Sequence, residues 1–310
     1  MPISLAEQPV ERIAAPDLRG DMDLTIDELR RLIRLAISVK QEPGRFAQAL
    51  TGRALTLLFE KPSLRTRFTF ELAIQQLGGY AVTSIGMIGD REPLKDVARN
   101  LDRWTQGIVA RVFSQDTIEG LAQWASVPVI NALSDLYHPC QAFADIQTMV
   151  ERFGDIRGRR LAYIGDGNNV AHSLMLTAGR LGVQVAVATP EGYAPDAGIV
   201  ERAREAGADI ILTNDPAEAV QNADAVYTDV WASMGQESEA EERKRIFAAY
   251  QVNEALMARA AQSAIFLHCL PAKRDQEVTD AVMESPQSAI FDQAENRLHA
   301  QKALLLMLLQ

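Results

Sequence analysis

The sequence predicts an α/β protein built from two doubly wound parallel-sheet domains. Two observations predict this class: short apolar runs of strand length recur along the chain, and amphipathic stretches separate them. Size is a third observation, because 310 residues with 47% hydrophobic content suffice for two cores of ordinary size. The chain contains no internal repeat or low-complexity tract that would favour another architecture.

The first half of the chain alternates strand and helix patterns. Amphipathic stretches such as Pro93–Trp104 and Thr117–Trp124 separate near-continuous apolar runs, which are typical of buried parallel strands. A helix is predicted over Asp145–Phe153 and a break at residues 154–158, so we expect the first domain to span residues 1–148. The predicted strands are Ala54–Phe59, Tyr80–Ile85, Gly107–Phe113 and Val127–Ala132.

A second alternating series predicts the other domain, over residues 149–292. After it, the pattern over Gln293–Leu309 predicts a final helix. The predicted strands of this series are Arg160–Ile164, Val183–Ala188, Asp209–Thr213, Ala225–Thr228, Ala264–Leu267 and Ser288–Phe291.

Composition excludes several classes of protein. A net charge of −10 argues against a non-specific nucleic-acid binder. Two cysteines in a chain of this length do not make a disulfide framework and indicate a reducing cytoplasm. Residues 1–20 lack the pattern of a signal peptide, and no uncharged apolar run reaches membrane-spanning length, so we expect no membrane partner.

The segment after the first predicted strand has the features of an anion site. Ser63 and Thr66 fall at the start of a predicted helix, where free backbone N–H groups and the helix dipole favour negative charge. The cations Lys61, Arg65 and Arg67 would complete a site for a doubly charged oxyanion such as phosphate. The alternative is that Ser63 is an ordinary N-cap and the arginines form a solvated face.

Further polar residues fall at the carboxyl ends of predicted strands, where doubly wound sheets gather ligands. Arg111 lies near the end of a strand, as a ligand-binding cation or as one half of a salt bridge. His138 and Gln141 flank Pro139 at a predicted helix start, and both can donate to a developing oxyanion. A purely structural His138 is the alternative.

Two strand ends of the second half carry polar side chains that could bind a ligand carboxylate or amine. The turn Gly165–Asn169 resembles a dinucleotide-binding turn, but Val170 takes the place of the third glycine. The amides of Asn168 and Asn169 suit a carboxylate or an amine better than a pyrophosphate. Asp229 could hold an ammonium group with help from Ser233, or simply cap a turn.

Cys269 closes another strand and could be a nucleophile, a base or an inert filler. Zinc is disfavoured, since no second Cys or His stands at ligand spacing near either cysteine. The charge-rich stretch Glu237–Arg245 is either a solvated surface or a ligand-gating loop.

These motifs, taken together and in order, resemble those of ornithine carbamoyltransferases, from about residue 16 to the C-terminus. The Ser-x-Arg-Thr-Arg and His-Pro-x-Gln motifs are general to carbamoyltransferases, whereas Ser-Met-Gly and His-Cys-Leu-Pro are specific to ornithine. The matching segments are Ser63–Arg67, Arg111, His138–Gln141, Asp229–Glu237, His268–Pro271 and Ala294–Arg297.

The resemblance implies transfer of the carbamoyl group of carbamoyl phosphate to the δ-amine of L-ornithine, giving citrulline and phosphate in arginine metabolism, with no metal and no other cofactor. It implies that helix 293–310 packs back on the first domain, and that the first domain binds carbamoyl phosphate and the second ornithine. The implied catalytic residues are Cys269, Arg111 and His138. The implied carbamoyl phosphate ligands are Ser63, Leu64, Arg65, Thr66, Arg111, His138, Gln141, Cys269, Leu270 and Arg297. The implied ornithine ligands are Asn169, Asp229, Ser233 and Met234.

Two departures from the family pattern stand out. Leu64 replaces a common threonine, which fits a position that contacts phosphate through its backbone N–H. Met87 stands where many relatives place a glutamine that reaches a neighbouring subunit, and Arg91 or Lys95 could replace it. Family members are typically trimers with sites between subunits, so a homotrimer is expected.

Two other functions compete with this interpretation. One is a carbamoyltransferase that acts on another amine, such as an N-acylated ornithine or putrescine. The other is a non-catalytic nucleotide-binding module built on the Gly165–Asn169 turn.

Overall fold

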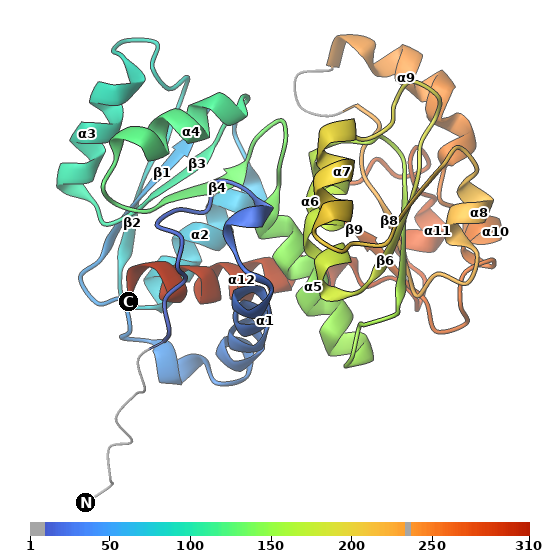
Figure 1. Cartoon of the computed structure of the whole chain (residues 1–310), viewed down its shortest axis with the longest axis horizontal. Coiled ribbons are helices and arrows are strands. Elements are labelled where there is room, and N and C mark those ends of the chain that lie inside the picture. Colours follow the sequence, from blue (N-terminus) through green and yellow to red (C-terminus); the bar gives the residue numbers. More distant parts are fainter. Residues whose placement is uncertain (1–9, 233–236) are drawn as a thin grey trace, which may run out of the picture.

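The computed structural model describes residues 10–232 and 237–310. Two α/β units lie side by side, each built on a parallel sheet, and helices run between them (Figure 1). Every pairing between neighbouring strands is parallel. The predicted fold class is therefore confirmed. No helix in the described residues is both long enough and apolar enough to cross a bilayer.

The first sheet has four strands in the order β2-β1-β3-β4. All six residues of the central strand β1 are buried, whereas all six residues of the edge strand β2 are at least partly exposed. Because β1 pairs with both β2 and β3, the strand order reverses beside the carboxyl end of β1. The strands are β1 Ala54–Phe59, β2 Tyr80–Ile85, β3 Ile108–Arg111 and β4 Val129–Leu133.

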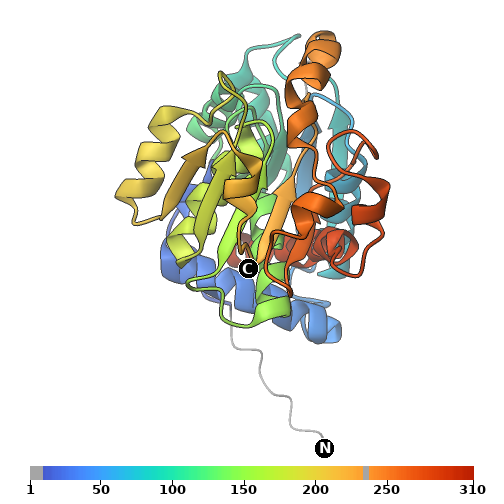
Figure 2. The same ribbon diagram turned by 90° about the vertical axis from the view of Figure 1, so that its right-hand side faces the viewer.

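The second sheet has five strands in the order β7-β6-β5-β8-β9, and helices cover both of its faces (Figure 2). Its order reverses between β5 and β8. In doubly wound sheets such reversal points open a crevice at the carboxyl ends of the strands. The strands are β5 Arg160–Ile164, β6 Gln184–Ala188, β7 Ile210–Thr213, β8 Ala225–Thr228 and β9 Ile265–His268.

The predicted strand at Ser288–Phe291 is wrong. Ser288 makes only an isolated bridge to Phe266, and the chain enters helix α12, Ile290–Leu309, two residues later. Periodicity cannot distinguish so short an apolar run from the first turn of a buried helix. The other helices are α1 Ile26–Gln41, α2 Leu64–Gln76, α3 Leu94–Trp104, α4 Gln115–Trp124, α5 Pro139–Phe153, α6 Asn169–Thr177, α7 Ala197–Glu205, α8 Pro216–Val220, α9 Ala240–Phe247, α10 Glu254–Met257 and α11 Asp280–Met283.

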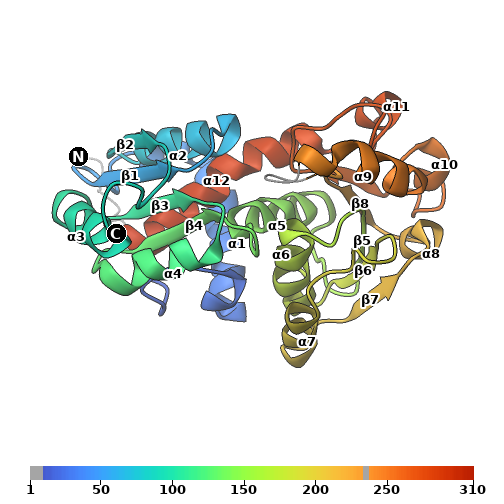
Figure 3. The same cartoon turned by 90° about the horizontal axis from the view of Figure 1, so that it is seen from above.

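Helix α12 runs from the second unit back across the first, where it packs on α1, α2 and α5 (Figure 3). Its last fourteen helical residues are almost entirely buried, as expected for a helix that fills a core from several sides. The expected return of the C-terminal helix to the first domain is confirmed. The expected domain boundary at residues 148 and 149 lies inside α5.

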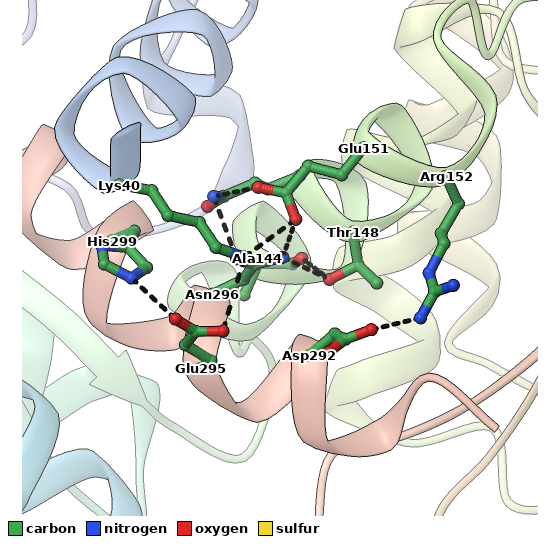
Figure 4. A network of polar contacts seen from close by, with 10 residues as sticks. Lys40, Ala144, Thr148, Glu151, Arg152, Asp292, Glu295, Asn296 and His299 are labelled. Carbon is green, nitrogen blue, oxygen red and sulfur yellow. Dashed lines mark hydrogen bonds and ion pairs between the residues drawn. The ribbon is translucent and has the colours of Figure 1, made fainter. Parts of the chain in front are cut away.

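A polar network holds α1, α5 and α12 together (Figure 4). Lys40 Nζ donates to Asn296 Oδ1 at 2.8 Å and pairs with Glu151 at 3.1 Å. The buried Asn296 donates in turn to Thr148 Oγ1 and to Glu151, both at 2.9 Å. Because buried amides need partners of fixed direction, this network sets the rotation of α12 about its axis and so the position of the next residue, Arg297.

Candidate active site

A cavity of about 560 Å³ opens between the carboxyl ends of the two sheets, and residues of both units line it. Its lining divides by charge into two halves. The cationic half consists of Ser63, Arg65, Thr66, Arg111, His138 and Arg297. The acidic half consists of Asp166, Asn168, Asn169, Asp229 and Cys269.

The start of α2 forms one wall of the cationic half. Ser63 is the N-cap residue, but its side chain makes no capping hydrogen bond, so the hydroxyl of this cavity residue is not used for capping. Arg65 also lines the cavity, and burial lowers the pKa of its guanidinium. Arg67 instead pairs with Glu71 at 2.9 Å on the partly exposed face of the helix. Ser63 and Arg65 of this segment therefore line the cavity, whereas Arg67 lies on the partly exposed face of the helix.

Arg111 and Arg297 converge on the buried Thr66. Arg111 donates to Thr66 Oγ1 at 3.4 Å from the end of β3, and Arg297 donates to the same oxygen at 3.2 Å from α12. Burial, followed by the nearby Arg297, lowers the pKa of Arg111 to about 10. Within residues 10–232 and 237–310, no carboxylate forms a salt bridge with Arg65, Arg111 or Arg297. Among the described residues, Arg111 is therefore not one half of a salt bridge at the strand end.

His138 precedes α5 and lines the same half. Its backbone N–H donates to Ser173 Oγ at 2.8 Å, and its ring Nδ1 has no partner among the described residues. Burial, and then the charges of Arg297 and Arg111, hold the pKa of His138 well below its ordinary value. The imidazole is therefore neutral at physiological pH.

Gln141 does not line the cavity. It lies directly behind the cationic half, where its Oε1 accepts from Arg297 at 2.6 Å and its Nε2 donates to Asp145 at 2.8 Å. Its contact with the cavity is therefore indirect, through Arg297.

The two asparagines expected at the second strand-end cluster both line the acidic half. Asn168 caps α6, since its Oδ1 accepts from the backbone N–H groups of Val170 and Ala171. Its Nδ2 donates to Asp229 at 2.9 Å. Asn169 Nδ2 donates to the carbonyl of Ser134 at 2.7 Å and so ties the second unit to the first.

Cys269 and Asp229 are in direct contact. Cys269 Sγ donates to Asp229 Oδ1 at 3.0 Å. Burial, and next the charge of Asp229, raise the pKa of the Cys269 thiol well above its ordinary value. The side chain is therefore a neutral thiol that donates a hydrogen bond, and not a thiolate.

His268 does not line the cavity, although its neighbour Cys269 does, because successive side chains of an extended chain point in opposite directions. Its Nε2 contacts the buried Glu277 at 3.2 Å, and its Nδ1 accepts from the Leu270 N–H at 2.9 Å. Possible ligand atoms of Asp229, His268 and Cys269 lie within 4.8 Å of one another. Because both ring nitrogens of His268 already have partners, these residues do not fit a metal ion.

Several lining residues were not singled out in the sequence. Asp166 lies in the Gly165–Asn169 turn and pairs with the buried Arg243 of α9 at 2.8 Å. Arg243 also donates to the carbonyl of Trp231 at 3.0 Å, so the charge-rich stretch is anchored to the cavity wall. Ser134 and Asp135 follow β4 at a strand end, which is the signal that could have identified them.

The remaining expected residues fall into three groups. Leu64 and Leu270 line the cavity. Ser233 and Met234 lie outside the described residues. Met87, Arg91 and Lys95 are exposed and do not line the cavity of their own chain.

Two family models together match nearly the whole chain. Residues 17–151 match the carbamoyl-P binding domain of aspartate/ornithine carbamoyltransferases, and residues 157–308 match the Asp/Orn binding domain. The chain belongs to the aspartate/ornithine carbamoyltransferase family. The match covers both units described above and includes every residue of the two cavity halves.

Comparison with individual relatives supports the same family membership. The chain is 49% identical to the ornithine carbamoyltransferase of Thermococcus kodakarensis, over 97% of this chain and 98% of the relative. It matches a solved ornithine carbamoyltransferase from Pyrococcus furiosus with a TM-score of 0.92 and 48% identity, covering 97% of this chain and 99% of that one. A structure of an acetylornithine transcarbamylase complexed with acetylcitrulline matches with a TM-score of 0.85 and 31% identity, covering 95% and 99%.

Proposed function

We propose that this enzyme transfers the carbamoyl group of carbamoyl phosphate to the δ-amine of L-ornithine, giving L-citrulline and phosphate. The observation that carries the proposal is the cationic half of the cavity. Three guanidinium groups meet there beside a helix start, and no carboxylate of the described residues forms a salt bridge with any of them. Such an arrangement is costly unless an anion completes it, and phosphate matches its charge and geometry.

The acidic half faces the other substrate. Asp229 could accept the ammonium group of an amino acid, and Asn169 lines the same half of the cavity. The two relatives named for ornithine that are described above are 49% and 48% identical to this chain, against 31% for the one named for acetylornithine, which favours free ornithine. Ser233 and Met234 are proposed to complete this half.

The reaction is an attack by the neutral amine on the carbonyl carbon. A nitrogen–carbon bond forms, the bond from that carbon to the phosphate oxygen breaks, and one amine proton leaves with phosphate or solvent. A free amine of this kind has a pKa of about 10.4, so the site must favour its neutral form. Arg65, Arg111 and His138 would stabilise charge on the carbonyl oxygen and the leaving phosphate.

The Cys269 thiol is proposed to orient the amine through hydrogen bonding. Its own hydrogen bond to Asp229 favours the neutral thiol over the thiolate.

We further propose that residues 1–148 and 293–310 form the carbamoyl phosphate domain, and that residues 149–292 form the ornithine domain. Both cysteines are free thiols, which supports a cytoplasmic location.

We also propose a homotrimer. Helix α2 presents a row of exposed apolar residues, Leu64, Phe68 and Leu72, next to the exposed Tyr80 and Val82 of the edge strand β2. Exposed apolar side chains beside an open sheet edge favour a protein contact, and a second copy of the chain would supply it. Light scattering of the purified enzyme measures the number of subunits.

The proposed reaction is tested by measuring citrulline formed from carbamoyl phosphate and ornithine. N-acetylornithine and putrescine at equal concentration serve as competing acceptors, and a faster rate with either would replace ornithine in the proposal. A non-catalytic nucleotide-binding module would bind NAD or ATP and form no citrulline. Two features oppose that module. Asn168 already caps the N–H groups of Val170 and Ala171 at the start of α6. Gly167 packs against the chain itself, since a Cβ there would lie 2.2 Å from the Pro195 nitrogen.

A further inference from the structure

We propose that Asp145 is a positioning residue that orients Arg297 in the cationic half and, at the same time, the strand end that carries Cys269 in the acidic half. Asp145 lies on α5 and is fully buried between the two halves, touching neither. It acts through two glutamine side chains, Gln141 and Gln293. This role of Asp145 rests on the proposed function in one respect, namely that the cationic half binds phosphate and the acidic half binds ornithine.

The first arm of this arrangement leads to Arg297. Gln141 Nε2 donates to Asp145 Oδ1 at 2.8 Å, and Gln141 Oε1 accepts from Arg297 at 2.6 Å. Because the amide nitrogen must face a carboxyl oxygen, the amide oxygen must face the guanidinium. Asp145 thus selects one of the two orientations of the Gln141 amide, and that amide fixes Arg297.

The interposed amide has an electrostatic consequence. A direct Arg297–Asp145 ion pair would compensate the guanidinium and compete with an anionic substrate. With Gln141 between them, Arg297 is held in place by a neutral acceptor and keeps its charge available to the cavity. The arrangement therefore combines fixed geometry with uncompensated charge, which is what recognition of an oxyanion requires.

The second arm leads to the strand end before Cys269. Gln293 Nε2 donates to Asp145 Oδ1 at 2.6 Å and to the Tyr227 hydroxyl at 3.2 Å. Gln293 Oε1 accepts from the backbone N–H of His268 at 2.9 Å. His268 is the last residue of β9 and directly precedes Cys269. The same carboxyl oxygen of Asp145 therefore holds elements of both halves.

The position needs an acceptor oxygen more than it needs a charge. Both glutamines donate to Oδ1, and Oδ2 has no partner in the part of the chain that the structure describes. Burial raises the pKa of Asp145 to about 7, although the hydrogen bonds from Gln293 and Gln141, the charge of Arg297 and the Tyr227 hydroxyl act to lower it. An asparagine can present its carbonyl oxygen at the Oδ1 position, so Asp145→Asn preserves both arms and Asp145→Ala removes both.

The experiment compares Asp145→Ala, Asp145→Asn and Met149→Ala for binding of inorganic phosphate, measured by titration calorimetry. Met149 is buried one turn further along α5 and makes no hydrogen bond to either arm, so its variant controls for lost packing. We expect Asp145→Ala to raise the Kd of phosphate by about tenfold or more, the loss of one well-oriented charged hydrogen bond. Asp145→Asn should stay within about threefold of wild type, and Met149→Ala should lose thermal stability without a change in Kd.

The second arm is tested with Gln293→Met, which keeps the side-chain volume and removes the amide. We expect its KM for ornithine to rise while its Kd for phosphate stays within about threefold. The proposal is overturned if folded Asp145→Ala binds phosphate like wild type, if Met149→Ala weakens binding equally, or if Asp145→Asn is as defective as Asp145→Ala. An unchanged KM for ornithine in Gln293→Met also overturns it. Phosphate affinity is independent of turnover, so failure of the citrulline assay would be a separate result.

Discussion

The cationic and acidic halves of the cavity differ in how their charges are compensated. In the acidic half, Asp166 pairs with Arg243, and Asp229 accepts from Cys269 and Asn168. In the cationic half, no carboxylate of the described residues forms a salt bridge with the three arginines. In the acidic half Asp166 therefore has a counter-ion within the chain and Asp229 has neutral hydrogen-bond donors, whereas the three arginines have no counter-ion among the described residues.

This difference has an energetic meaning. Buried like charges that lack a counter-ion destabilise the fold, and only a ligand can recover that cost. Arg111 remains protonated at neutral pH, since its pKa of about 10 lies well above 7. The charge is therefore kept at the expense of stability, which is typical of a binding site and not of a structural ion pair. Substitutions in the two halves should accordingly affect different substrates.

The largest expected effect is that of Arg65→Ala. Loss of a charged hydrogen bond costs on the order of 2–4 kcal/mol here, so kcat/KM for carbamoyl phosphate should fall by roughly thirtyfold to several hundredfold. Arg67→Ala is the matched control, because Arg67 lies on the same helix and pairs with Glu71 outside the cavity. Near-normal kcat/KM in folded Arg65→Ala, by steady-state kinetics and circular dichroism, would contradict the phosphate assignment.

Asp229→Asn should act mainly on the other substrate. If Asp229 holds the α-ammonium group, the variant should raise KM for ornithine by about tenfold or more and change that for carbamoyl phosphate far less. Asp224→Asn is the control, because Asp224 pairs with Arg159 at the opposite end of β8. Equal losses for both substrates would mean that Asp229 is structural.

Cys269→Ala and Cys269→Ser distinguish orientation from covalent catalysis. A thiolate nucleophile would form a carbamoyl thioester, and either variant would abolish turnover. The neutral thiol predicts measurable activity with poorer ornithine binding and a shifted pH profile. Cys140→Ala is the control, since Cys140 is buried outside the cavity. A stoichiometric burst of phosphate without ornithine, lost in Cys269→Ala, would show that the thiol is a nucleophile.

The sequence predicted those cavity residues that lie at the ends of strands. Four strands have their predicted bounds, at β1, β2, β5 and β8, because their apolar runs are interrupted sharply by polar or turn residues. The polar residues at the ends of such runs meet at the carboxyl edge of their parallel sheet. Ser63 and Arg111 lie at this edge of the first sheet, and Asn169 and Asp229 lie at this edge of the second.

The parts that sequence patterns could not predict depend on tertiary contacts. Helix α1 was not identified, and the pairing of Arg243 with Asp166 joins residues far apart in the sequence. The position of Gln141 behind Arg297 arises because α12 returns across the first unit and brings Arg297 between Gln141 and the cavity. Hydrophobic periodicity carries no information on such pairings.

The smallest expected effect concerns His138 and the source of positive charge in the cationic half. Its lowered pKa means that the folded protein keeps the imidazole neutral, while the unfolded chain takes up a proton near pH 6.5. Unfolding is therefore favoured as pH falls through 6.5, and His138→Asn should lose less stability between pH 7.5 and 5.5 than wild type. Urea unfolding at both pH values measures this difference, and NMR of the ring protons, assigned with the same variant, follows the titration directly. A His138 pKa near 6.5 in the folded protein would contradict this prediction. The imidazole would then become positively charged on acidification, and the arginines would not be the only source of positive charge in the cationic half.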